Sequence, residues 1–65
     1  MMDLTRFAQM DSTMLMSIVN MKLRNEFDNL YELAQAYDID AAALCEKLEH
    51  SGFHYHPEFN QFRSV

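Results

Sequence analysis

Residues 29–53 read NLYELAQAYDIDAAALCEKLEHSGF, and this stretch decides the fold. Apolar residues recur in its first half at the three- and four-residue spacing that lines one face of a helix. These residues are Leu30, Leu33, Ala34 and Tyr37, and a second set, Leu44, Cys45 and Leu48, follows in the other half. The spacing therefore predicts two short helices joined by a tight turn, which is the outline of a helix-turn-helix unit.

Polar residues indicate where these two helices begin and end. Asn29, with Glu32 three residues later, fits a capping box, in which the Asn oxygen accepts an amide hydrogen bond and the Glu reaches back to the cap. Asp38 interrupts the first helix, because Asp tolerates a left-handed backbone, and Asp40 is a good cap for the second. Gly52 ends the second helix, since glycine enters the left-handed region freely.

A longer helix is expected before this unit, and a hairpin after it. Either Asp11 or Ser12 can cap the longer helix. Its apolar stripe consists of Leu15, Ile18, Val19, Leu23 and Phe27. Residues 53–56 alternate Phe or Tyr with His, Pro57-Glu58 predicts a type I turn, and residues 59–63 return as a second strand.

The sequence thus predicts an α+β fold, in which a three-helix, helix-turn-helix-like core is followed by a small C-terminal β-hairpin, the layout of a winged-helix-like domain. We expect helices at residues 11–27, 29–37 and 40–51 and the hairpin at residues 53–63. Residues 1–10 are expected to form an N-terminal arm, either frayed or with Phe7 docked on the core. Residues 11–63 are expected to form a single small domain.

Length and composition fit one small domain. The chain has 65 residues, and 49% of them are hydrophobic, which argues against a disordered chain. A single cysteine excludes an internal disulfide and fits a reducing, intracellular setting. No run approaches the about 18 apolar residues of a membrane span, and the opening residues, MMDLTRFAQMD, are too polar for a signal peptide. We therefore expect a soluble cytoplasmic protein without a membrane partner.

Three segments carry a resemblance to a known family: the run MDSTMLMSIVNMKLRNEF, the DID turn, and an aromatic segment that ends in NQF. Over residues 10–62 the chain resembles a family of small bacterial proteins catalogued only as a domain of unknown function. The matching residues are Asp11, Leu15, Ser17, Val19, Asn20, Leu23, Arg24, Asp38, Ile39, Asp40, Asn60, Gln61 and Phe62. The family pattern has Asp-Pro where this chain has Asp11-Ser12, so the helix start here relies on side-chain capping. The resemblance implies a free-standing bacterial domain and brings no activity, cofactor or site residues.

The candidates for metal binding and catalysis have simpler structural explanations. Cys45 with His50, His54 and His56 could supply zinc ligands, but a lone cysteine within an apolar helical stripe behaves as a small buried hydrophobe. Paired with a histidine, Cys45 would also lack an oxyanion hole and a pocket. We therefore expect no metal site, no cofactor and no catalysis.

Acidic charge is concentrated in the helix-turn-helix stretch of a chain whose net charge is −5. Residues 26–49 hold Glu26, Asp28, Glu32, Asp38, Asp40, Glu46 and Glu49 against Lys47 alone. Phosphate contacts supply most of the affinity of proteins for nucleic acids. An acidic surface repels phosphates, so this stretch is unfavourable for nucleic-acid binding. The expected recognition helix also offers Ala41, Ala42 and Ala43 where base readout needs Arg, Lys, Asn or Gln.

The favoured hypothesis is a non-catalytic protein-interaction or regulatory accessory module, and the alternative is a winged-helix-like DNA-binding regulator. The expected partner is another protein or a second copy of the chain. The candidate partner-binding residues are Ala42, Ala43, Glu46, Glu49, Met14 and Met21. The methionines fit either an adaptable contact patch or gap filling in a small core. The role of Asn20 and Arg24 is left unassigned. They bond the loop, bond the Asn60-Gln61 segment, or face solvent.

Overall fold

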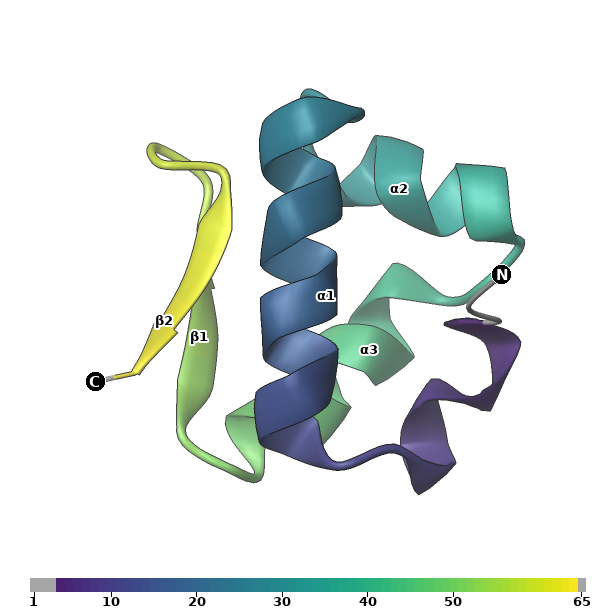
Figure 1. Ribbon diagram of the computed structural model, residues 1–65, viewed down its shortest axis with the longest axis vertical. Coiled ribbons are helices and arrows are strands. Elements are labelled where there is room, and N and C mark those ends of the chain that lie inside the picture. The colour runs from purple at the N-terminus through teal and green to yellow at the C-terminus, as the bar shows by residue number, and fades with distance from the viewer. Residues whose placement is uncertain (1–3, 65) are drawn as a thin grey trace.

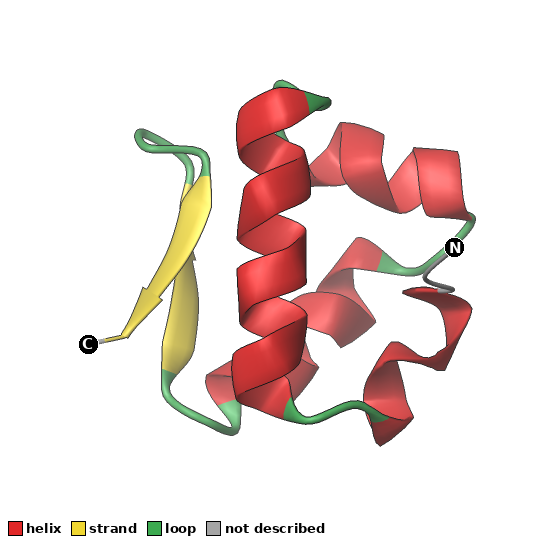
Figure 2. Ribbon diagram, viewed as in Figure 1, coloured by secondary structure: helices red, strands yellow, loops and turns green. Residues whose placement is uncertain are grey.

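The computed structural model describes residues 4–64, apart from the side chain of Thr5. The elements in chain order are a 3-10 helix η1 (Leu4–Gln9), three α-helices α1 (Ser12–Asn25), α2 (Leu30–Tyr37) and α3 (Ala41–Glu49), and two strands β1 (Phe53–His56) and β2 (Gln61–Ser64). The strands form an antiparallel hairpin (Figure 2). The predicted α+β fold of three helices followed by a C-terminal hairpin is therefore confirmed.

Helix α1 lies at the centre of the molecule (Figure 1). The hairpin covers one side of α1, and α2, α3 and η1 lie on the other. Helix α3 contacts both α1 and β1, so the hairpin closes the core rather than projecting from it. None of the described helices combines the length and the apolar character that crossing a membrane requires.

The core forms where the predicted apolar stripes meet. Its buried members are Leu4, Leu15, Val19, Leu23, Leu30, Leu33, Leu44, Leu48 and Phe62. Ile18, Phe27, Phe53 and Tyr55 are partly buried and pack against this cluster. The predicted apolar stripe of the first α-helix is thus confirmed, and the aromatic residues of the hairpin pack against the helices.

The three predicted helix caps are also confirmed. Side-chain oxygens of Asp11, Asn29 and Asp40 accept hydrogen bonds from backbone N–H groups two or three residues later, at 3.0, 2.8 and 2.9 Å. The capping box differs in one detail. The Glu32 carboxylate accepts the N–H of Asp28 at 3.4 Å, one residue before the cap.

Two helices end earlier than predicted. Helix α1 stops at Asn25, where the N–H groups of Glu26 and Phe27 converge on the carbonyl of Lys22 at 2.8 and 3.2 Å. Helix α3 stops at Glu49, because the next turn tightens and the N–H of Gly52 bonds the carbonyl of Glu49 at 2.9 Å. Phe27 continues the apolar spacing beyond the end of α1, and Gly52 lies three residues beyond the end of α3, so neither signal could locate the last turn.

The turn between α2 and α3 forms as predicted. Asp38 adopts a left-handed conformation with φ of 57°, and its N–H bonds the carbonyls of Ala34 and Gln35. Asp40 is extended and caps α3. The DID segment is therefore a helix stop followed by a helix start.

The expected N-terminal arm is, over residues 4–9, the helix η1 packed against the rest of the molecule. Leu4 is only 1% exposed and belongs to the core, and Phe7 packs against the core. Residues 4–9 are therefore docked on the core, which is the second of the two predicted alternatives. Residues 1–3 of the arm lie outside the described residues.

Candidate functional site

Asn20, which the sequence left unassigned, fixes strand β2 to helix α1. Its side-chain oxygen accepts the N–H of Phe62 at 2.7 Å, and its side-chain nitrogen donates to the carbonyl of Phe62 at 2.9 Å. One carboxamide thus occupies both backbone groups of Phe62, as a neighbouring strand would. The edge of β2 that faces α1 is therefore closed at this position.

Asn60 ties the other end of the hairpin to the helices. Its side-chain nitrogen donates to the carbonyls of Leu23 and Phe27, at 3.1 and 3.0 Å, and so satisfies carbonyls at the end of α1. Its side-chain oxygen accepts the hydroxyl of Tyr55 at 2.7 Å. That hydroxyl in turn accepts the N–H of Leu30 at 3.2 Å, where α2 begins. The hairpin turn is thus bonded to both α1 and α2.

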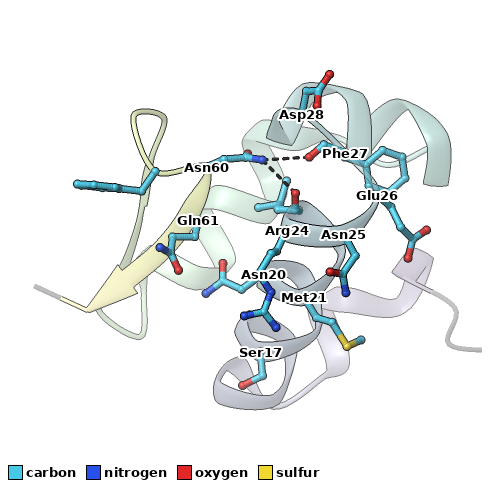
Figure 3. Close-up of a pocket in the computed structure, with 12 residues that line it drawn as sticks. Ser17, Asn20, Met21, Arg24, Asn25, Glu26, Phe27, Asp28, Asn60 and Gln61 are labelled. Carbon is cyan, nitrogen blue, oxygen red and sulfur yellow. Dashed lines mark hydrogen bonds between the residues drawn. The ribbon is translucent and has the colours of Figure 1, made fainter.

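A groove of about 500 Å³ lies between α1 and the hairpin (Figure 3). Its exposed or half-buried lining includes Ser17, Met21, Arg24, Asn25, Phe59 and Gln61. Because Asn20 and Asn60 also line the groove, the groups that fix its two walls belong to the site itself. The groove depends on contacts between segments far apart in the sequence, so periodicity could not reveal it.

Helix α1 presents one exposed stripe beside this groove. Met14, Ser17, Met21 and Arg24 follow at spacings of three, four and three residues, and all four are exposed. Met14 is 57% exposed and Met21 is 48% exposed, whereas Met10 and Met16 pack against the core. The sequence left open whether Met14 and Met21 fill gaps in the core or lie on a contact surface. In the structure both lie on the surface.

Phe59 lines the groove from the hairpin turn, and Arg63 lies over its ring. Phe59 is 55% exposed, and the guanidinium carbon of Arg63 lies 4.3 Å from the centre of its ring. Neither residue is among the candidates predicted from the sequence. One feature of the sequence could have indicated that Phe59 is exposed. It lies in the loop that Pro57-Glu58 begin, where a side chain need not be buried.

The charges around the groove are unevenly paired. Glu26 lies 3.5 Å from Lys22, and within residues 4–64 the only other close ion contact joins His56 and Glu58. Arg24 and Arg63 therefore have no carboxylate partner among the described residues. Figure 3 shows Arg24 beside Asn20 on α1, while Glu26 and Asp28 point away from β2.

The candidate residues on α3 form a second, separate surface. Ala42, Ala43, Glu46 and Glu49 are all exposed, on the side of α3 opposite the buried residues Leu44 and Leu48. These four residues lie on α3, whereas Met14 and Met21 lie on α1. The structure therefore divides the six candidate residues into an acidic α3 surface and an α1 surface.

Cys45 and the three histidines lie on α3, at its end and on β1. Cys45 packs against the core, where desolvation, and secondly the charge of Glu49, raise the pKa of its thiol. His54 and His56 lie on the strand face opposite Tyr55, and His50 follows the end of α3. Across the described part of the chain, no group of three or more potential ligands is arranged to hold a metal ion.

Comparison with known protein families identifies a match over most of the chain. A family model described as "Domain of unknown function (DUF4250)" matches residues 9–62. The match extends from the end of η1 into β2 and therefore includes both asparagines and the whole groove. The resemblance found in the sequence is confirmed. Neither a curated protein nor a solved structure matches the chain.

Proposed function

We propose that this chain, which belongs to the DUF4250 family of unknown function, is a non-catalytic protein-interaction or regulatory accessory module. Its partner is a protein, either a different chain or a second copy of this one. We also propose a bacterial, cytoplasmic setting, which the resemblance to small bacterial proteins and the single free cysteine favour. Surface recognition, rather than a reaction, is then the function of the fold.

The observation that carries this proposal is the acidic outer face of α3. In a helix-turn-helix protein that binds DNA, the corresponding helix meets bases and phosphates. Here its exposed side chains include Glu46 and Glu49, and the carboxylate of Asp40 stands at its N-terminus. This face repels a polyanion but can steer a basic surface of a protein partner.

The positions of the candidate catalytic groups also support a non-catalytic role. Asp38 and Asp40 are occupied as a helix stop and a helix cap. A thiol such as that of Cys45, whose pKa is raised, is a poor nucleophile at neutral pH because the thiolate is the reactive form. Structural roles account for the groups that a catalytic hypothesis would use.

Photocrosslinking in cells tests the proposal. A benzoylphenylalanine placed at Ala43 should capture a specific protein, because Ala43 is exposed on α3. The same group at Ala36, which is exposed on α2, is the matched control. The substitutions Glu46→Lys and Glu49→Lys should abolish the Ala43 adduct without changing the melting temperature. That result would support recognition of the partner by the acidic face. Identical adducts from Ala43 and Ala36 would contradict it.

The alternative is a winged-helix-like DNA-binding regulator, which the helix-turn-helix and hairpin layout favours. Fluorescence anisotropy of labelled duplex DNA distinguishes the two functions. We expect no binding at micromolar protein in moderate salt, because the α3 face is acidic. Binding that weakens steeply as salt increases would replace the protein-interaction proposal with the DNA-binding one.

A further inference from the structure

We propose that the outer edge of strand β1 pairs with the same edge of a second copy of this chain, so that the two hairpins form one continuous antiparallel sheet. The pairing is centred on His54, which then lies opposite its own copy. This inference goes beyond the proposed function, which places recognition of a partner on the acidic face of α3. It concerns the hairpin, so the two can fail independently.

The contacts of Asn20 show in which direction the backbone groups of the hairpin point. Because Asn20 on α1 bonds both the N–H and the carbonyl of Phe62, these two groups point away from β1. Phe62 is paired with Tyr55, and two residues opposite each other in an antiparallel hairpin either bond one another or both point outward. The N–H and carbonyl of Tyr55 therefore point away from β2. The same holds for Phe53, two residues earlier on the strand.

These outward groups of β1 have no partner within the described molecule. The sheet has two strands, so the outer edge of β1 lacks a neighbouring strand. Among residues 4–64, the backbone groups of Phe53 and Tyr55 make no hydrogen bond outside the hairpin, and the bonds of Tyr55 to other segments use its hydroxyl. No helix lies in front of or behind the strand in Figure 2, and all four residues of β1 are partly exposed. One edge of the hairpin is thus closed by Asn20, and the other is open.

Strand β1 also lacks the features that protect an edge strand from pairing. Charged side chains, proline and bulges discourage a second strand from adding to an edge. Residues 53–56 read FHYH, without Lys, Arg, Asp, Glu or Pro, and each is paired with one residue of β2 without a bulge. The strand therefore presents no fixed charge that would repel a second copy, although the chain carries a net charge of −5.

The outward groups of β1 are complementary to those of a second, antiparallel β1. Phe53 of each copy can pair with Tyr55 of the other, and each such pair exchanges two hydrogen bonds. All the outward groups of the strand are then used. His54, midway between the two pairs, lies opposite its own copy on the two-fold axis, where the strands approach most closely.

Neighbouring registers would use these groups less well. A shift toward the turn would place Phe53 opposite Pro57, which has no N–H and whose carbonyl already accepts the N–H of Asn60. A shift in the other direction would place Tyr55 opposite Ser51, whose N–H already bonds a carbonyl of α3. The backbone of the hairpin therefore favours the register centred on His54.

A second copy fits this edge better than a flexible peptide does. Either occupant gains the same few hydrogen bonds, because the edge offers only two residues with outward groups. A flexible segment must be ordered when it binds, whereas β1 is already fixed by β2 and by the packing of Phe53 and Tyr55 against the core. Because two four-residue strands make a small interface, we expect a weak dimer that forms at high protein concentration.

Charge substitutions at His54 test both the pairing and its register. His54→Glu places like charges directly opposite each other at the two-fold axis, so it should weaken dimerisation about two- to fivefold in sedimentation equilibrium at low salt. His54→Lys should have the same effect. A mixture of the two variants should restore association, because Glu and Lys then face each other. Gln61→Glu is the matched control, since it adds the same charge on β2, away from the outer edge of β1.

Amide hydrogen exchange gives an independent readout of the open edge. In dilute protein the amide of Tyr55 should exchange much faster than that of Phe62, which Asn20 bonds. Raising the protein concentration should slow exchange at Phe53 and Tyr55 in the unmodified chain, and less so in His54→Glu. Equal protection of the Tyr55 and Phe62 amides in dilute protein would contradict an open edge.

Several outcomes of the sedimentation experiment would overturn the inference. They are a chain that stays monomeric up to about 1 mM, association that His54→Glu leaves unchanged, and a mixture of variants that does not restore association. Protection of the Tyr55 amide by the protein captured in the Ala43 experiment, with the chain itself monomeric, would assign the edge to that protein instead. If dimerisation fails while the Ala43 adduct persists, only this inference is lost.

Discussion

At the scale of single residues, Asn20 contributes most to the placement of the hairpin. A half-buried carboxamide on α1 acts as a short substitute for a β-strand, because it both donates to and accepts from the backbone of Phe62. Asn60 performs a related role at the end of α1. The two asparagines are therefore explained by architecture, whereas Arg24 remains available on the surface.

Replacing Asn20 by Ala should lower the free energy of unfolding by about 1–3 kcal/mol, because the N–H and carbonyl of Phe62 lose their partners where water has limited access. Asn25→Ala is the control, since Asn25 is exposed near the end of the same helix. It should change stability by about 0.5 kcal/mol or less. Urea denaturation measures both values. Equal effects of the two substitutions would contradict the role of Asn20.

The reactivity of Cys45 should respond to Glu49. The negative charge of Glu49 contributes to the raised pKa of the thiol, so Glu49→Gln should lower that pKa and increase the thiolate fraction at a given pH. The rate of reaction with a disulfide reagent at pH 8 should rise about two- to fivefold, the range for one partly exposed charge. Glu46→Gln is the control and should have a smaller effect. A slower reaction in Glu49→Gln would contradict the assignment.

At the scale of elements, short-range side-chain caps determine where each α-helix begins. Asp11, Asn29 and Asp40 each bond an N–H group within three residues of their own position. These interactions depend on local sequence alone, so the starts could be predicted closely. The ends of α1 and α3 depend on where the chain must leave for its next contact, and they were predicted two residues too late.

The cap of α3 can be tested by Asp40→Ala. Because the side chain of Asp40 accepts the N–H of Ala42 at 2.9 Å, its loss should reduce the free energy of unfolding by about 1 kcal/mol. Asp28→Ala is a suitable control, since Asp28 is exposed and precedes the cap of α2. Thermal denaturation compares the two variants. A smaller loss for Asp40→Ala than for Asp28→Ala would exclude the capping role.

At the scale of the whole molecule, the hairpin is part of the core and not an appendage. Phe62 is 2% exposed and belongs to the same buried cluster as the leucines of all three α-helices. A chain of this size has a stability of only about 0.1 kcal/mol per residue. The helices and the hairpin should consequently unfold together.

The two phenylalanines of the hairpin provide a matched test of this cooperativity. Phe62→Ala should lower the free energy of unfolding by about 3–5 kcal/mol, because a large cavity opens in the core, and the midpoint of urea unfolding followed by the helical signal in far-UV circular dichroism should fall accordingly. Phe59→Ala, in the same hairpin but 55% exposed, should change stability by about 0.5 kcal/mol or less. An unchanged midpoint of helix unfolding in Phe62→Ala would show that the helices fold without the hairpin.

The candidate surfaces could be only partly predicted from the sequence. Ala42, Ala43, Glu46 and Glu49 were placed correctly on an exposed face, because a helical period and two buried leucines define the opposite face. The methionines could not be divided in this way, since methionine fits both a core and a surface. Only packing placed Met21 outside and Met16 inside.

By itself, the sequence determined the elements of this protein: three capped helices, a left-handed turn at Asp38 and a C-terminal hairpin. The caps and the turn depend on interactions within about one helical turn, and the hairpin pairs residues that are close along the chain, from His56 with Gln61 to Phe53 with Ser64. Only the tertiary structure decided that Asn20 bonds Phe62, a residue 42 positions later, and that a groove lined by Arg24, which has no carboxylate partner among the described residues, opens beside this contact. Such contacts arise when the core closes, and no spacing along the chain encodes them.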